Sequence, residues 1–230
     1  MALPVFQATG SQAQANGTSA TVSWPTHQAD DIGLLIVQTS NSPVTLGGAG
    51  AGDWTLTADS PQGTGTENNV VSTRLTAYWA RATGSSQSDV TIVADNNVVI
   101  GGIFTVRGCI TTGDPWDVTA GDVEAATDTA NVVVPGDTTT VVDCLIAAIF
   151  AHGIDDSVDV INADWTNGDL ASFTQRVEYQ TPAGKGGGLS VATGGLATAG
   201  AYGTSTVSMT SNHTQGRISI ALRPPVVGSA

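Results

Sequence analysis

The stretch DDIGLLIVQT at residues 30–39, together with VDCLIAAIFA at residues 142–151, decides the fold of this 230-residue chain. Each stretch contains a short apolar run that is too brief and too uniform to form an amphipathic helix. A strand with one solvated face alternates apolar and polar residues, and these runs do not alternate. We therefore expect residues 32–37 and 144–150 to be central strands that are covered on both faces.

Outward from these runs, the chain reads as short strands separated by clusters of Gly, Asn, Asp, Ser and Pro. Only 12% of the residues are charged, and Thr, Ser, Gly, Ala and Val take their place, which favours strands and turns over helices. The pattern predicts an all-β, antiparallel, jelly-roll-like β-sandwich. The candidate strands cover residues 3–9, 19–24, 32–39, 53–57, 70–82, 88–94, 98–107, 129–134, 140–151, 171–180, 187–193, 203–210 and 216–223.

The chain also resembles itself. Four segments recur in the same order about 111 to 116 residues later, which is typical of an internal repeat. The pairs are 30–39 with 142–151, 53–60 with 164–171 (Trp54 opposite Trp165), 74–84 with 188–200, and 90–108 with 206–224 (Asn96 opposite Asn212, Arg107 opposite Arg223). We predict a pseudo-repeat of about 19–108 and 130–224 within a single β-sandwich domain, 1–230. The alternative is convergent composition in a chain rich in Thr, Ala and Gly.

Both predicted halves end in the same way, with IFTVRG at 103–108 and ISIALRPP at 218–225. Each is a strand that ends in an arginine followed by a residue that breaks the strand. We expect Arg107 and Arg223 at matching corners, where each caps backbone carbonyls or pairs with a carboxylate. A functional pair of arginines is the alternative.

The charge balance excludes two classes of partner. The net charge is −13 and Lys185 is the single lysine, whereas nucleic acids and anionic membranes are bound through clusters of Lys and Arg. The N-terminal sequence MALPVFQATGSQAQ shows no basic region followed by an apolar core, so no secretory signal is visible. The apolar runs fall far below the ~20 residues that span a bilayer. We expect a protein made in soluble form in a cytoplasm.

Metal and disulfide chemistry have little support. Cys109 and Cys144 are too few for a disulfide scaffold or a Cys-based zinc site, although a single bridge between them stays possible. His27 with Asp30 and Asp31, and His152 with Asp155 and Asp156, share a spacing that invites a metal site, but no third ligand pattern accompanies them. We predict no metal and no cofactor.

Nor does an enzyme motif appear. The chain lacks a G-x-S-x-G elbow and a P-loop. Its only glutamates are Glu67, Glu124 and Glu178, so a glycoside-cleaving pair would have to come mostly from aspartates on distant strands. We predict no catalytic residues.

The segment GDPWDVTAGD at 113–122 is the most distinctive stretch for binding. Trp116 lies there among Asp114, Asp117, Asp122 and the nearby Asp128, which we interpret as a solvated acidic loop. A calcium site there would need six to eight oxygen ligands. An exposed Trp beside carboxylates could stack on a sugar or fill a neighbour's pocket, so Trp116, Asp114 and Asp117 are the candidate contacts with a ligand or partner. A loop folded down as a plug is the alternative.

Several segments together resemble a group of small virion proteins of tailed bacteriophages. They are ALPVFQATG, SWPTHQADDIGLLIVQT, RLTAYWARATG, GDPWDVTAGD, TTTVVDCLIAA, GGGLSVATGGLATAG and ISIALRPP, and the resemblance extends from residue 2 to about residue 225. It implies a β-sandwich subunit that decorates or completes a virion, and it supplies no catalytic residues.

We therefore expect a non-enzymatic structural protein of the virion, above all a capsid decoration (cement) protein on the head. A tail or baseplate component and a displayed carbohydrate-binding module are the alternatives. The expected partners are the major capsid protein or tail proteins and further copies of this chain, as a trimer or dimer. The segments expected to reach a neighbour comprise Leu3, Pro4, Val5 and Phe6 at the start of the chain and Pro224, Pro225 and Val226 near its end.

Overall fold

The computed structural model describes residues 3–95, 98–127, 129–154 and 161–225. These residues form strands and one 3-10 turn, η1 (Ala51–Asp53), and no helix among them is long and apolar enough to cross a membrane. The strands are β1 (Val5–Thr9), β2 (Ala13–Ala15), β3 (Ser19–Val22), β4 (Ile32–Thr39), β5 (Val44–Gly47), β6 (Thr55–Leu56), β7 (Gln62–Thr64), β8 (Thr73–Arg81), β9 (Val90–Ala94), β10 (Val99–Arg107), β11 (Trp116–Glu124), β12 (Asn131–Val134), β13 (Cys144–His152), β14 (Ala171–Thr181), β15 (Gly187–Leu196), β16 (Ser205–Ser208) and β17 (Gln215–Leu222).

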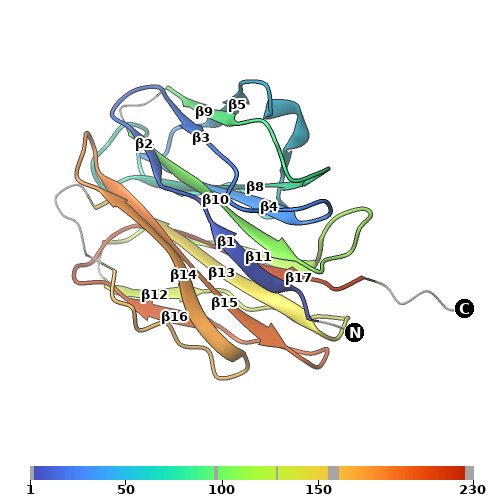
Figure 1. Ribbon diagram of the computed structural model, residues 1–230. Coiled ribbons are helices and arrows are strands. Elements are labelled where there is room, and N and C mark those ends of the chain that lie inside the picture. Colours follow the sequence, from blue (N-terminus) through green and yellow to red (C-terminus); the bar gives the residue numbers. More distant parts are fainter. Residues whose placement is uncertain (1–2, 96–97, 128, 155–160, 226–230) are drawn as a thin grey trace, which may run out of the picture.

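Each half of the chain builds its own two antiparallel sheets. The first half has a large sheet in the order β1-β10-β4-β8-β6, with β2 beside β10 and β7 beside β8, and a small sheet β3-β9-β5. The second half has a large sheet β11-β17-β13-β15-β14 and a small sheet β12-β16. The two large sheets face each other in the middle of the molecule, and a small sheet covers the outer face of each (Figure 1). The predicted all-β, antiparallel class is confirmed.

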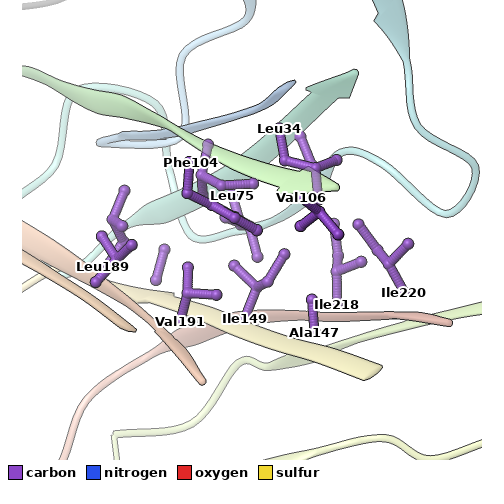
Figure 2. Packing of buried hydrophobic residues seen from close by; sticks show 14 of the residues in the cluster. Leu34, Leu75, Phe104, Val106, Ala147, Ile149, Leu189, Val191, Ile218 and Ile220 are labelled. Atoms are coloured by element: carbon purple, nitrogen blue, oxygen red, sulfur yellow. The ribbon is translucent and has the colours of Figure 1, made fainter. Parts of the chain in front are cut away.

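One apolar core is shared by the two halves. Side chains of the two large sheets point toward one another and interdigitate, as Figure 2 shows. The labelled members are Leu34, Leu75, Phe104 and Val106 from the first half and Ala147, Ile149, Leu189, Val191, Ile218 and Ile220 from the second. Separate clusters then fill the space between each large sheet and its small sheet. Neither large sheet could bury its inner face without the other half.

This layering explains the unbroken apolar runs. In β4, Leu34 and Ile36 face the shared core, whereas Leu35 and Val37 face the small sheet of the same half. In β13, Ile149 faces the shared core and Phe150 faces the other way. The prediction that these two strands are covered on both faces is confirmed.

Four neighbouring strands of the first large sheet, β1-β10-β4-β8, correspond in order to β11-β17-β13-β15 of the second. Ile32 pairs with Val106, the residue before Arg107, and Leu145 pairs with Leu222, the residue before Arg223. Ile32 therefore corresponds to Leu145. The alignment of 30–39 with 142–151 is one residue out of step, because it set Ile32 against Cys144. In a strand such a slip moves every side chain to the opposite face.

Local features repeat as well. Asp30 and Asp143, which precede β4 and β13, have φ angles of 68° and 58°. Trp54 and Trp165 are both buried between a large and a small sheet. Asn96 lies outside the described residues, so its match with Asn212 stays a prediction.

Each predicted strand range overlaps a strand of the structure. The strands that the sequence did not reveal are β2, β5, β7 and β11. Three of these are short. The fourth, β11, is the segment interpreted as an acidic loop, and that interpretation is wrong: Trp116 begins a nine-residue edge strand that pairs with β17.

Candidate functional site

The two terminal segments lie at the same end of the molecule. A Cβ on Gly108 would lie 3.7 Å from the Pro4 Cα, and the Ile110 N–H donates to the Arg223 carbonyl oxygen at 3.0 Å. The chain therefore begins beside the end of β10 and finishes beside the residues that follow it (Figure 1). We call this end the terminal face. Its members are the predicted contact residues that the structure describes, Leu3, Pro4, Val5, Phe6, Pro224 and Pro225; Val226 lies outside the described residues.

Only some side chains of the terminal face are buried. Pro4 and Pro224 are buried, and Phe6 packs against the shared core. The side chain of Val5, by contrast, is 46% exposed, and Pro225 is also exposed. The structure thus brings the two predicted segments together and leaves apolar side chains there on the surface.

A groove of about 230 Å³ lies beneath the first strand. One wall is the segment from Leu3 to Phe6, and the other comes from β13, the start of β14 and the end of β15. Gly195 lets the chain approach closely, because a Cβ there would lie 2.7 Å from a methyl carbon of Leu3. The groove is mostly apolar and opens at the terminal face.

Arg176 is the charged residue of this groove. It falls at a register shift of β14, where Gln175 pairs with Ala192 and Val177 with Val191, so it is the extra residue of a β-bulge. Bulges redirect side chains, and here the guanidinium carbon lies 5.0 Å from the centre of the Phe6 ring. Its Nε donates to Thr193 Oγ1 at 2.9 Å.

The structure separates Trp116, Asp114 and Asp117 into different roles. The Trp116 ring is half-buried and meets Trp79 edge to face at 5.6 Å between ring centres. The Asp117 carboxylate accepts hydrogen bonds from the Thr140 N–H at 2.5 Å and its hydroxyl at 2.8 Å. Asp114 is exposed, and its backbone carbonyl accepts from Arg223 at 3.2 Å. The plug alternative therefore describes Trp116 better than an open ligand platform.

The aspartates of this region do not converge. Asp122 forms an ion pair with Arg217 at 3.0 Å, Asp117 caps residues 140 and 141, and Asp128 lies outside the described residues. Calcium needs six to eight oxygens around one point. The partners of Asp117 and Asp122 indicate instead that these carboxylates stabilise the fold.

The histidine sites are likewise divided. The Asp31 carboxylate accepts hydrogen bonds from Nε and Nη2 of Arg107, each at 2.8 Å. His27 does not contact it in this way: its Nδ1 lies 2.6 Å from the Pro25 carbonyl oxygen. His152 is fully buried, and burial together with nearby His213 lowers its pKa to about 3. Asp155 and Asp156 lie outside the described residues. Among the described residues no three His, Cys, Asp or Glu side chains gather as a metal site would require.

Both cysteines are free thiols in the described chain. Burial raises the pKa of Cys109 to about 12 and, with nearby Asp117 and Asp143 adding to the effect, that of Cys144 to about 11. Because the thiolate is the reactive form, both act as small buried side chains at neutral pH.

A second cleft, polar and about 450 Å³ in volume, lies between residues 8–13 and residues 21–26, where no sequence pattern indicated a site. Its lining carries hydroxyls, the Gln12 amide and Trp24, and no charged side chain. Tyr179 from the other half fixes one wall by donating to the Gly10 carbonyl at 2.6 Å. The other wall rests on Gly33, where a Cβ would lie 2.4 Å from the Trp24 ring. In the second half, Gly136 stands where the first half has Trp24, each two residues past the matching strand.

No protein-family model matches the chain, and neither a curated protein nor a solved structure matches it.

Proposed function

We propose that this chain is a non-enzymatic structural protein of a tailed bacteriophage virion, most directly a capsid decoration protein that docks on the head. The observation that carries the proposal is the terminal face: both terminal segments lie at this end, Val5 and Pro225 are exposed there, and Val5 also lines a groove. Apolar surface with little charge is what a stable interface buries at its centre.

The strand edges support docking through side chains rather than through strand addition. Three edge strands of the large sheets, β1, β11 and β14, each contain a register shift. Bulges of this kind discourage open-ended pairing between copies. A closed assembly, such as a trimer or dimer, is the association that this pattern favours.

We also propose that the architecture is jelly-roll-like. Consecutive strands of the first half alternate between its small and large sheets, from β3 to β4 to β5 and from β9 to β10, as they do in jelly rolls. We interpret the chain as one domain, because the core between the large sheets belongs to both halves.

The test is binding of the purified protein to heads that lack it and to tails, followed by co-sedimentation and mass photometry. We expect saturable binding to heads in multiples of three or six. Val5→Asp should abolish that binding, because it places a charge in the terminal face. Val133→Asp is the matched control, since Val133 is 38% exposed on a strand of the outer small sheet. Binding to tails alone would contradict head decoration and favour a tail or baseplate role.

The second candidate function is a displayed carbohydrate-binding module. Its sugar site would be the polar cleft beside Trp24 rather than the Trp116 region. Its hydroxyl and amide lining suits a neutral sugar. Retention of the protein on host polysaccharide, together with no binding to heads or tails, would support this candidate and overturn the first.

A further inference from the structure

The groove of the terminal face exists because the two halves carry side chains of different size at matched positions. Phe6 pairs with Val106 and Trp116 pairs with Leu222, so these two rings correspond. Trp116 packs on Trp79. The residue that corresponds to Trp79 is Thr193, because Trp79 pairs with Leu34 and Thr193 with its counterpart Ala147.

The next positions are also reduced in size. Ala80 and Arg81 follow Trp79, whereas Gly194 and Gly195 follow Thr193. In the first half Arg81 lies over the Trp79 ring at 5.8 Å, and this corner is filled. In the second half the large side chains are missing, Arg176 covers Phe6 instead, and the remaining space is the groove of about 230 Å³. An apolar cavity of roughly 150 Å³ is enough to bind benzene, so this groove accommodates one aromatic ring.

The positive charge of Arg176 indicates which chemical groups the groove can bind. Within the described residues, the Nη atoms of Arg176 make no hydrogen bond, and only its Nε is used, toward Thr193. The groove carries no carboxylate of its own, although the chain as a whole has a net charge of −13. A guanidinium beside an apolar groove is complementary to a carboxylate next to an aromatic ring.

We propose that this groove receives an aromatic side chain of a partner protein, with an adjacent carboxylate of that partner paired to Arg176. The inserted ring occupies the space that Trp79 and Arg81 fill in the other half, between the Leu3–Phe6 segment and the glycines of β15. The inference deepens the proposed function and rests on it for the identity of the partner, a neighbouring virion protein.

The experiment uses small probes, so that its failure is distinct from a failure of head binding. N-acetyl-tryptophan, which carries a carboxylate, and N-acetyl-tryptophanamide, which does not, are titrated into the full chain and followed by amide NMR. We expect saturable shifts at Phe6, Arg176 and Gly195, with the amide binding roughly five- to tenfold more weakly. Arg176→Gln should remove that preference for the carboxylate.

Ala171→Trp blocks the groove, because Ala171 is exposed at its rim, and should abolish the shifts. Ser19→Trp, at an exposed strand position in another layer, is the control for adding an indole and should leave them unchanged. Absence of saturable shifts, or equal shifts in Ala171→Trp, would overturn the groove even where heads are still bound. Equal affinity for both probes would overturn the pairing with Arg176. Probe binding without head binding would overturn the proposed function and leave the groove standing.

Discussion

At the scale of single residues, the matching arginines of the two halves bind different partners. Asp31 is 1% exposed and accepts two hydrogen bonds from Arg107 and one from the Gln28 N–H. Arg223 caps the carbonyl of exposed Asp114. Both outcomes were predicted, a carboxylate partner or a carbonyl cap, and each arginine takes one of them.

This difference predicts unequal costs of mutation. Arg107→Met leaves the buried Asp31 carboxylate without its two hydrogen bonds from Arg107; because the Arg107 side chain itself is 36% exposed, we expect a cost of about 1–3 kcal/mol. Arg223→Met removes one exposed hydrogen bond and should cost under about 1 kcal/mol. Urea unfolding at pH 7 measures both free energies. Equal losses for the two variants would contradict the assigned roles.

The buried His152 predicts a dependence of stability on pH. Its pKa is about 3 in the folded protein and about 6.5 when unfolded. Below pH 6.5 the unfolded chain therefore binds a proton that the folded chain does not, and this contribution to stability falls as the pH is lowered toward 3, by on the order of 4 kcal/mol over the window. Above pH 6.5 the contribution is constant.

The variant His152→Gln isolates this group, because glutamine keeps an acceptor and does not titrate. The difference in unfolding free energy between wild type and variant should shrink from pH 7 to pH 4. A difference that stays constant over this range would show that His152 is not the titrating group.

At the scale of strands, close approach between the two halves depends on glycine at particular positions. Gly102 of β10 lies under the Tyr179 ring of β14, and a Cβ there would lie 2.3 Å from a ring carbon. Tyr179 in turn bonds to the Gly10 carbonyl and Thr9. The contact therefore links β10, β14 and the first strand.

Gly102→Ala should lower stability by about 1–3 kcal/mol, because an added methyl group in a packed interface forces its neighbours to shift. Gly84→Ala is the matched control, since a Cβ there meets nothing within 4 Å. Thermal unfolding compares the two variants. An unchanged melting temperature in Gly102→Ala would mean that the ring is not held against this strand.

Strand positions were largely predictable from sequence, because turn residues mark the ends and apolar runs mark the central strands. β11 was missed because Asp114, Asp117 and Asp122 make it look like a solvated loop, while their partners lie far away in the sequence. The one-residue slip between β4 and β13 arose because strands apolar on both faces carry no alternation to fix their phase.

The groove could have been seen in the sequence only in part. Aligning 74–84 with 188–200 sets Trp79 against Thr193, which already shows a large residue replaced by a small one. That Phe6 and Arg176 meet at this position follows from the packing of two sheets and from a bulge, and no local pattern indicates either.

At the scale of the whole molecule, the two halves have separate sheets but share one core. Each large sheet has an inner face that only the other half covers. Fragments 1–110 and 111–230, made separately, should therefore lack cooperative unfolding or aggregate, because each exposes one side of the shared core. Circular dichroism with urea titration tests this, and a cooperative transition in either fragment would contradict it.

We infer that the core shared by both large sheets joins the two halves into a single folding unit. Native-state hydrogen exchange of the β4 and β13 amides tests it most directly, since these strands lie at the centre of each half. If the two halves unfold together, the most protected amides of both strands exchange with the same free energy, equal to that of global unfolding. A difference of about 2 kcal/mol or more between the two strands would show that the halves open separately and would contradict the claim.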